Sequence, residues 1–268
     1  MTQELQKRVT LAVEAAEAAG KLLLKVRNHL EIEAKGYGNW VTNADKEAEH
    51  IIRTAIKETF PNDVMYGEEG GGASAAELAT KDHLWIVDPL DGTTNYLRGF
   101  DQFAVSLGYW QGGQPAIGVI YAPAKDELYL AIQGSGATLN REPIQVSETK
   151  VLAEALVGTG FPYEPDAHGY NNSDHAANFL ARCPDIRRMG AAALDLASVA
   201  AGRLDGFWEF GLAAWDVAAG ILLVQEAGGQ VSGFRGEPLD ILAERIVVSN
   251  GLIHEEMLQV LALGQTGL

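Results

Sequence analysis

A short apolar run that ends on closely spaced carboxylates is the feature that most constrains this chain. Residues 84–87 predict a buried strand, and Asp88, Pro89 and Asp91 follow directly. Because proline lacks the backbone N–H that a strand ladder needs, the strand is expected to end here. Small residues at 92–94 then favour a helix start with free amides. Carboxylates attract a hard cation and helix-start amides attract phosphate, so the stretch indicates metal-assisted phosphate chemistry.

The charge balance limits the classes of ligand. The chain has 268 residues and a net charge of −16, which argues against general binding to a nucleic-acid backbone. No direct nucleic-acid partner is therefore expected. A chain this acidic that binds an anionic substrate needs bound cations to reverse the local field.

The sequence also indicates the compartment. A single cysteine, Cys183, excludes an internal disulfide framework and favours a reducing, cytoplasmic location. Residues 1–9 carry charges and lack the apolar core of a signal peptide. The uncharged stretch 102–124 is interrupted by turn residues at 111–115, so no membrane span is expected.

Hydrophobic periodicity predicts an α/β (α+β) chain with two subdomains and a polar boundary at residues 141–153. The N-terminal subdomain, residues 1–145, is expected to combine helices with an antiparallel sheet and to carry most of the metal ligands. Its expected helices lie at 3–27 and 43–60, and its meander strands at 103–110, 116–121 and 127–132. Residues 35–40 are expected to form a loop, and residues 75–82 a short helix or a loop.

The C-terminal subdomain, residues 146–268, alternates strands and helices and is expected to be an α/β unit that carries Asp216 and the substrate contacts. Its expected strands lie at 155–159, 186–189, 206–210, 230–234 and 246–249. Its expected helices lie at 174–182, 191–201, 216–227 and 253–263.

Acidic side chains recur where apolar segments end. Taken singly, each has an ordinary explanation: Asp45 complements a helix dipole, Asp216 caps a helix, and residues 68–69 lie in a solvated loop. Taken together, they stand where α/β sheets place their sites. A like-charged pair about 4 Å apart costs roughly 1 kcal/mol in water and about 4 kcal/mol at a dielectric constant of 20. Oxygen ligands without matching histidines or cysteines favour Mg²⁺ over Zn²⁺ as the relieving cation.

Three motifs in order resemble the signatures of the inositol monophosphatase family. They are Gly-Glu-Glu at 67–69, the stretch 85–94, and Trp-Asp-Val-Ala-Ala-Gly at 215–220; residues 43–45 fit the family's preceding element. The resemblance covers nearly the whole chain. It implies a layered αβαβα sandwich of the sugar-phosphatase type, Mg²⁺-dependent hydrolysis of phosphate monoesters, sensitivity to Li⁺, and a homodimer.

The resemblance also implies a set of metal ligands. Glu68, Asp88 and the backbone carbonyl of Leu90 would hold one Mg²⁺. Asp88, Asp91 and Asp216 would hold a second. A third, weaker ion would lie near Glu68, so the expected number is two or three.

Catalytic and substrate-binding roles follow from the same resemblance. Asp45 and Thr93 would orient and deprotonate the attacking water, and Glu69 is placed with them in the catalytic group. The substrate-binding group comprises Asp91, Gly92, Thr93, Gly190, Ala191, Ala192, Glu209 and Asp216. The amides of Gly92 and Thr93 would receive phosphate, and Glu209 would contact a substrate hydroxyl. Many relatives carry Ser or Thr where this chain has Ala191, which removes a hydroxyl near the substrate.

The expected reaction is hydrolysis of a small phosphorylated polyol, myo-inositol 1-phosphate first, by a metal-activated water and without a covalent enzyme intermediate. Related sugar, nucleotide and histidinol phosphatases are the alternatives within the enzyme class. Glu209 favours a polyol over a second phosphate, because a carboxylate repels another anion. A regulatory binding protein of transcription complexes is the alternative from another class. Arg187 and Arg188 would then contact a partner or a dimer mate; the alternative is ordinary surface or interface charge.

Overall fold

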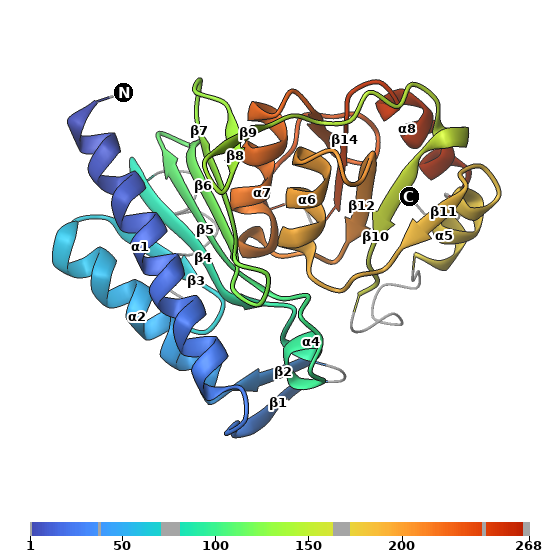
Figure 1. Ribbon diagram of the computed structural model, residues 1–268. Coiled ribbons are helices and arrows are strands. Elements are labelled where there is room, and N and C mark those ends of the chain that lie inside the picture. The colour runs from blue at the N-terminus through green and yellow to red at the C-terminus, as the bar shows by residue number, and fades with distance from the viewer. Residues whose placement is uncertain (1, 37–38, 71–80, 163–171, 243–244, 265–268) are drawn as a thin grey trace.

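Two β-sheets and the helices around them form five layers in the computed structural model (Figure 1). The structure describes residues 2–36, 39–70, 81–162, 172–242 and 245–264. The outer layer on one side holds α1 (Gln3–Val26) and α2 (Asn43–Thr59), the central layer holds α6 (Ala192–Ala200) and α7 (Ala214–Glu226), and the opposite outer layer holds α5 (Ser173–Leu180) and α8 (His254–Leu263). The predicted αβαβα sandwich is confirmed.

The first sheet has seven strands in the order β3-β4-β5-β6-β7-β8-β9. Their bounds are β3 (Val64–Gly67), β4 (His83–Asp91), β5 (Ala104–Gln111), β6 (Gln114–Ala122), β7 (Glu127–Ile132), β8 (Ala137–Leu139) and β9 (Glu142–Ile144). From β4 onward neighbouring strands are antiparallel, as the predicted meander requires. The pair β3 and β4 is parallel, so Gly67 lies beside Val87 and both strands lead toward the same end of the sheet.

The second sheet has five strands in the order β11-β10-β12-β14-β13. Their bounds are β10 (Leu156–Thr159), β11 (Asp185–Arg187), β12 (Gly206–Phe210), β13 (Gln230–Ser232) and β14 (Arg245–Ser249), and a short 3₁₀ helix, η1 (Leu152–Glu154), precedes β10. Strand β10 is parallel to both β11 and β12, whereas β14 is antiparallel to its neighbours β12 and β13. The sheet is therefore mixed.

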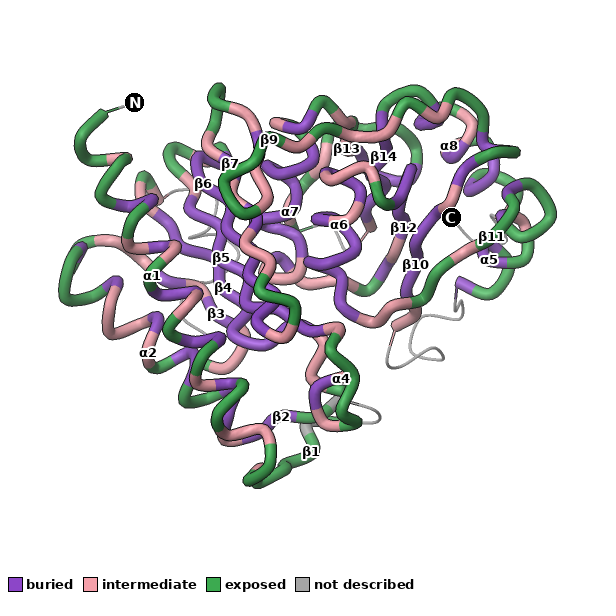
Figure 2. The backbone as a smooth tube through the Cα atoms, viewed as in Figure 1, coloured by how far each residue is buried: buried purple, intermediate pink, exposed green. Residues whose placement is uncertain are grey.

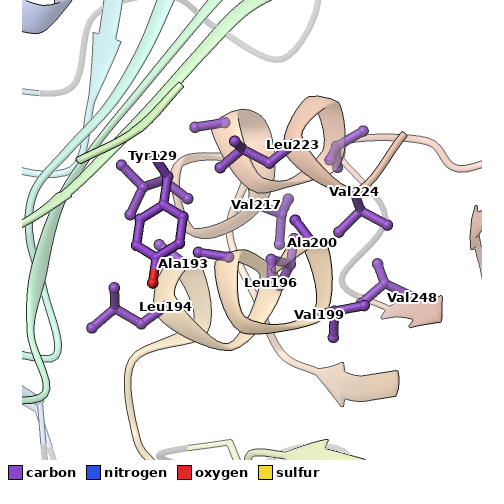
Figure 3. Close-up of a cluster of buried hydrophobic side chains, with 14 of the residues drawn as sticks. Tyr129, Ala193, Leu194, Leu196, Val199, Ala200, Val217, Leu223, Val224 and Val248 are labelled. Carbon is purple, nitrogen blue, oxygen red and sulfur yellow. The ribbon is translucent and has the colours of Figure 1, made fainter. Parts of the chain in front are cut away.

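The central helices are apolar on most sides because both sheets cover them. Residues 217–224 of α7 are all buried, as expected for a helix packed between two layers. Figure 3 shows Leu196 of α6 near Val217 of α7, with Tyr129 of the first sheet near Ala193 and Leu194. Buried backbone runs through both sheets and this central layer (Figure 2).

Glycines let α7 approach the first sheet closely. A Cβ on Gly118 of β6 would lie 2.5 Å from the carbonyl oxygen of Ala219, which is backbone and cannot move away cheaply. A Cβ on Gly108 of β5 would lie 2.8 Å from the Cβ of Ala218. The distance between helix and sheet thus depends on these two positions having no side chain.

Strand β4 does not end at Pro89, so that prediction was wrong. The strand continues to Asp91, with a register shift in its pairing with β5 between Asp88 and Asp91. The irregularity leaves Pro89 where no ladder N–H is needed, which is how a proline is accommodated in a strand. The helix start that follows is α4 (Thr93–Leu97).

The prediction that residues 35–40 form a loop was wrong for most of the stretch, because two strands reach into it. Strands β1 (Ile32–Gly36) and β2 (Asn39–Thr42) pair antiparallel in a small separate sheet. Its polar sequence lacks a strong alternation, which is why periodicity did not indicate strands. Of the predicted segment 75–82, residues 75–80 lie outside the described residues.

Within the residues described, no helix has both the length and the apolar character needed to cross a membrane.

Replacing Gly118 by alanine should destabilise the fold by about 1 to 3 kcal/mol, because the added methyl group overpacks against the backbone of α7. The free energy of unfolding, measured with urea, checks this. Gln114→Ala on the exposed start of the same strand is the control and should change stability by no more than about 0.5 kcal/mol. Equal stability of Gly118→Ala and the wild type would show that α7 can shift without cost.

Candidate metal and phosphate site

Asp45 is held by the residues that start α2 and by the residue that starts α4. Its Oδ2 accepts hydrogen bonds from the backbone N–H of Thr42 at 2.9 Å and from the Thr42 hydroxyl at 2.5 Å, which makes a capping box. Its Oδ1 lies 3.2 Å from the hydroxyl of Thr93, which donates to it. The predicted place of Asp45 in the first helical turn is therefore correct, and one carboxylate oxygen remains directed at Thr93.

Hydrogen bonds made by its own side chains stabilise the bend at residues 88–93. Asp88 Oδ1 accepts from the backbone N–H of Leu90 at 2.9 Å, and the carbonyl of Leu90 accepts from the Thr93 hydroxyl at 3.0 Å. Gly92 has a φ of 85°, and a Cβ there would lie 2.8 Å from the carbonyl oxygen of Gln102. The bend therefore requires glycine at this position.

Asp91 joins the bend to the central layer. Its Oδ2 accepts from the backbone N–H of Ala193 in the first turn of α6, at 2.8 Å. The two residues are 102 positions apart, so no local pattern predicted this contact. The bond places Asp91 at the N-terminus of α6, where the helix dipole favours a negative charge.

Asp216 is the third residue of α7 and not its N-cap, so that interpretation and the predicted helix start at 216 were wrong. The helix begins at Ala214, and Asp216 Oδ2 accepts from the backbone N–H of Ala213 at 2.7 Å. Asp45 and Asp216 therefore occupy equivalent positions in two different helices. Each folds one oxygen back onto the helix start, which orients the other oxygen.

One cavity of about 160 Å³ brings the predicted metal ligands together. Its lining includes Glu68, Asp88, Leu90, Asp91 and Asp216, together with Gly92 and Thr93. The ligands come from the end of β3, from β4 and from α7, which are separated by up to about half of the chain. Glu69 does not line the cavity; its backbone N–H donates to Glu49 Oε2 at 2.8 Å.

Burial and mutual repulsion make these carboxyl groups hard to ionise. Burial, with the charges of Glu68 and Asp91, raises the pKa of Asp88 well above its usual range. Burial and the nearby Glu68 raise the pKa of Asp91 to about 7, although the Ala193 N–H opposes the shift. Burial and Asp91 raise the pKa of Asp216, and burial raises that of Asp45. A group of acids with this property is a candidate site for cations.

The donor set fits Mg²⁺. Within the described ranges, no three His, Cys, Asp or Glu side chains are arranged closely enough to hold one ion. Mg²⁺ does not need such a cage, because it takes one or two carboxylates and completes its shell with waters and substrate phosphate. Several carboxylates and a backbone carbonyl around one cavity match that preference, and the lining has no histidine or cysteine to favour Zn²⁺.

A second cavity, of about 220 Å³, adjoins the first, since Asp91, Thr94, Gly211 and Asp216 line both. Its further lining includes Gly190, Ala191, Ala192 and Glu209, which are the predicted substrate contacts. The Gly190 loop is fixed by Asn95, whose Nδ2 donates to the carbonyls of Met189 at 2.8 Å and Gly190 at 3.2 Å.

Glu209 lies on β12 above Gly160, where any Cβ would collide with its carboxylate. Burial and the charge of Asp91 raise the pKa of Glu209 to about 8, while Arg188 opposes the shift. In the metal-free protein, this raised pKa weakens the repulsion of a second anion that is expected from Glu209 near neutral pH.

Sequence reasoning missed several residues of the site. Residues 160–162 line the second cavity without any motif to mark them. Glu49 supports the Gly-Glu-Glu turn through the Glu69 amide and pairs with Arg53 at 2.6 Å. A glutamate on the buried face of α2, one helical turn after Asp45, was the available signal.

Comparisons with known proteins agree with this geometry. The model described as "Inositol monophosphatase family" matches residues 4–264. An inositol-1-monophosphatase from Synechocystis sp. is 42% identical over 263 residues, covering 97% of this chain and 90% of that protein. The Nus factor SuhB of Pseudomonas aeruginosa is 41% identical, covering 92% of each. The solved inositol monophosphatase from Anabaena (Nostoc) sp. is 39% identical, with a TM-score of 0.88 and 97% of each chain covered.

The metal-free protein should lose stability as pH rises from about 4 to about 7. Asp91 has a folded pKa of about 7, above the value of about 3.9 for an unfolded chain, so the folded state holds the extra proton in this window. The loss should be on the order of 3 kcal/mol, measured by urea unfolding in EDTA at pH 5 and pH 7.5.

Asp91→Asn should reduce this pH dependence, to which Asp88 and Asp216 also contribute, whereas Asp174→Asn on the exposed start of α5 should leave it unchanged. Mg²⁺ should restore stability at pH 7.5, because it binds the deprotonated carboxylates. The same slope in Asp91→Asn as in the wild type would exclude Asp91 as its source.

Proposed function

We infer that this chain, which belongs to the inositol monophosphatase family, hydrolyses phosphate monoesters and releases phosphate from myo-inositol 1-phosphate. One observation carries the inference. The cavity lined by four carboxylates opens into a second cavity lined by Glu209 and the Gly190 loop, and Asp91 and Asp216 stand at the boundary. A phosphate in the first cavity and its polyol in the second would place the bond to be broken between them.

The proposed Mg²⁺ ligands are those that line the first cavity. Glu68, Asp88 and the Leu90 carbonyl would hold one ion. Asp88, Asp91 and Asp216 would hold a second, with waters completing the shell where the three carboxylates lie too far apart to bind one ion directly. When bound, Mg²⁺ would neutralise the phosphate and make a water acidic enough to attack phosphorus at neutral pH. The pairing of Leu90 O with the Thr93 hydroxyl keeps this carbonyl turned into the bend.

Thr93 and Asp45 supply the route for the proton. The one proton of the Thr93 hydroxyl can point to Asp45 Oδ1 at 3.2 Å or to the Leu90 carbonyl at 3.0 Å. When it points to Asp45, the hydroxyl oxygen is free to accept a hydrogen bond from a water. Burial raises the pKa of Asp45, which makes it a better proton acceptor near neutral pH than an exposed aspartate. The catalytic role predicted for Glu69 is kept as a proposal; its backbone amide fixes the turn through Glu49.

Substrate groups would be held on both sides of the reacting phosphorus. The amides of Gly92 and Thr93, at the first cavity, would donate to phosphate oxygens. Glu209 in its protonated form can donate to a polyol hydroxyl as well as accept from one. Ala191 adds no hydroxyl of its own, so the loop would contact the polyol through its backbone.

Further properties are proposed from the family resemblance alone. They are a homodimer, inhibition by Li⁺, a cytoplasmic location, and occupancy by two or three Mg²⁺ ions.

Asp88→Asn should lower kcat for myo-inositol 1-phosphate by on the order of 100-fold or more, because it removes a negative charge shared by both proposed ion sites. Phosphate release measured with and without Mg²⁺, and again with added Li⁺, checks this. Asp174→Asn is the matched control, because Asp174 is exposed at the start of α5 and lines neither cavity, and it should retain full activity. A wild-type protein that releases no phosphate from any sugar-like monoester in the presence of Mg²⁺ would overturn the function.

A regulatory role in transcription is the second candidate, and the similarity to the Nus factor SuhB of Pseudomonas aeruginosa is the observation that favours it. The hydrolase proposal expects Asp88→Asn to abolish the cellular function of the gene in a deletion strain. Full complementation by Asp88→Asn, with hydrolysis lost in vitro, would assign the cellular role to binding instead.

A further inference from the structure

Ser106 carries a buried hydroxyl on β5 that no proposed step uses. The residue is 0% exposed, and among the residues that the structure describes its Oγ has no hydrogen-bond partner. Burying a hydroxyl in this way is unfavourable, because the group loses its hydrogen bonds to water. Alanine would fill the same position without that cost, so the hydroxyl needs an explanation.

The sheet places one polar side chain beside this hydroxyl. Paired residues of an antiparallel sheet present their side chains on the same face, as do residues two positions apart in a strand. Along β5 these neighbours of Ser106 are Ala104 and Gly108, and the paired residue on β6 is Ile120. None of the three has a polar side-chain atom. On β4 the paired residue is Asp88.

This face of the sheet meets α7, the helix that carries another proposed metal ligand. Ile86 precedes Asp88 on the same face of β4 and packs with Ala218 of α7 in one buried cluster. A Cβ on Gly108 of β5 would lie 2.8 Å from the Cβ of Ala218. Because Ser106 shares this face, its hydroxyl and the Asp88 carboxylate are both directed at the central layer.

The Asp88 carboxylate can accept a further hydrogen bond. Its Oδ1 accepts from the backbone N–H of Leu90 at 2.9 Å, and an ionised carboxylate offers about four acceptor positions. Paired residues in a ladder have Cβ atoms about 4.5 to 5.5 Å apart, so rotation of the Ser106 side chain about χ1 brings its hydroxyl to a carboxylate oxygen. Donors of this kind orient the carboxylates that bind a metal and change the affinity for it.

We propose that Ser106 is a positioning residue of the metal site, and that its hydroxyl donates a hydrogen bond to the Asp88 carboxylate in the Mg²⁺-bound protein. Mg²⁺ binds the ionised carboxylate, which is the form that accepts the strongest hydrogen bonds. The inference rests on the proposed function, because that function places both ions on Asp88. Ser106 affects the binding of the ions and takes no part in breaking the phosphate bond.

Ser106→Ala tests the inference through two measurements. In EDTA, the urea midpoint of unfolding should stay the same or rise, because the variant removes an unpartnered hydroxyl. The Mg²⁺ concentration needed to raise this midpoint by a fixed amount should increase about tenfold or more, because one hydrogen bond to a charged acceptor is lost. The Mg²⁺ requirement for phosphate release should increase by a similar factor.

Two further variants separate this role from a general effect of losing a hydroxyl. Ser198→Ala is the matched control, because the Ser198 hydroxyl donates to the carbonyl of Leu194 within α6 at 2.7 Å and lines neither cavity. It should leave the Mg²⁺ dependence unchanged. Adding Ser106→Ala to Asp88→Asn should cause no further loss of Mg²⁺ affinity, since the charged acceptor is already gone.

Three results would contradict the role of Ser106. They are an unchanged Mg²⁺ affinity in Ser106→Ala, a lower stability or a failure to fold in EDTA, and a further tenfold loss of affinity in the Asp88→Asn background. The proposed function can fail separately: a wild type that binds Mg²⁺ but releases no phosphate refutes the function, while the unfolding measurements still decide on Ser106. A wild type whose midpoint does not respond to Mg²⁺ would overturn both.

Discussion

Repulsion among carboxylates in one small cavity is the constraint that the rest of the structure must satisfy. Three of the four side chains accept a hydrogen bond from a backbone N–H: Asp88 from Leu90, Asp91 from Ala193, and Asp216 from Ala213. Such bonds favour the charged form and fix the direction of the second oxygen. These hydrogen bonds from the backbone therefore offset part of the repulsion between the carboxylates, and they do not require a bound cation.

The positions of these carboxylates depend on how the central helices α6 and α7 pack in the hydrophobic core. Ala193, which donates to Asp91, is itself in the core between the two sheets (Figure 3). Close packing of α7 against Gly108 and Gly118 sets how far Asp216 stands from β4. A shift of the central helices would thus move Asp216 relative to the proposed ligands on β4 and would stretch the hydrogen bond between Ala193 and Asp91. Core packing and site geometry depend on the same contacts.

Local physics explains which predictions succeeded. The capping position of Asp45 and the ends of α1 and α2 follow from periodicity and from Pro61, so the sequence was sufficient there. The continuation of β4 through Pro89 could not be predicted from the sequence. It depends on the pairing with β5, whose register shifts between Asp88 and Asp91, so that Pro89 does not need a backbone N–H. The start of α7 was predicted two residues late, because Asp216 has the side chain of an N-cap but folds back from the third position.

The sequence by itself determined the kinds of groups in the candidate site, namely carboxylates at 68, 88, 91 and 216 and glycine at 92, because these depend on residue type. Only the tertiary structure decided that these groups share one cavity, that burial raises the pKa of Glu209 to about 8, and that Arg188 lines the second cavity while Arg187 pairs with Asp185. Those properties depend on burial and on distances between segments far apart in the chain, and no periodicity within a segment carries that information.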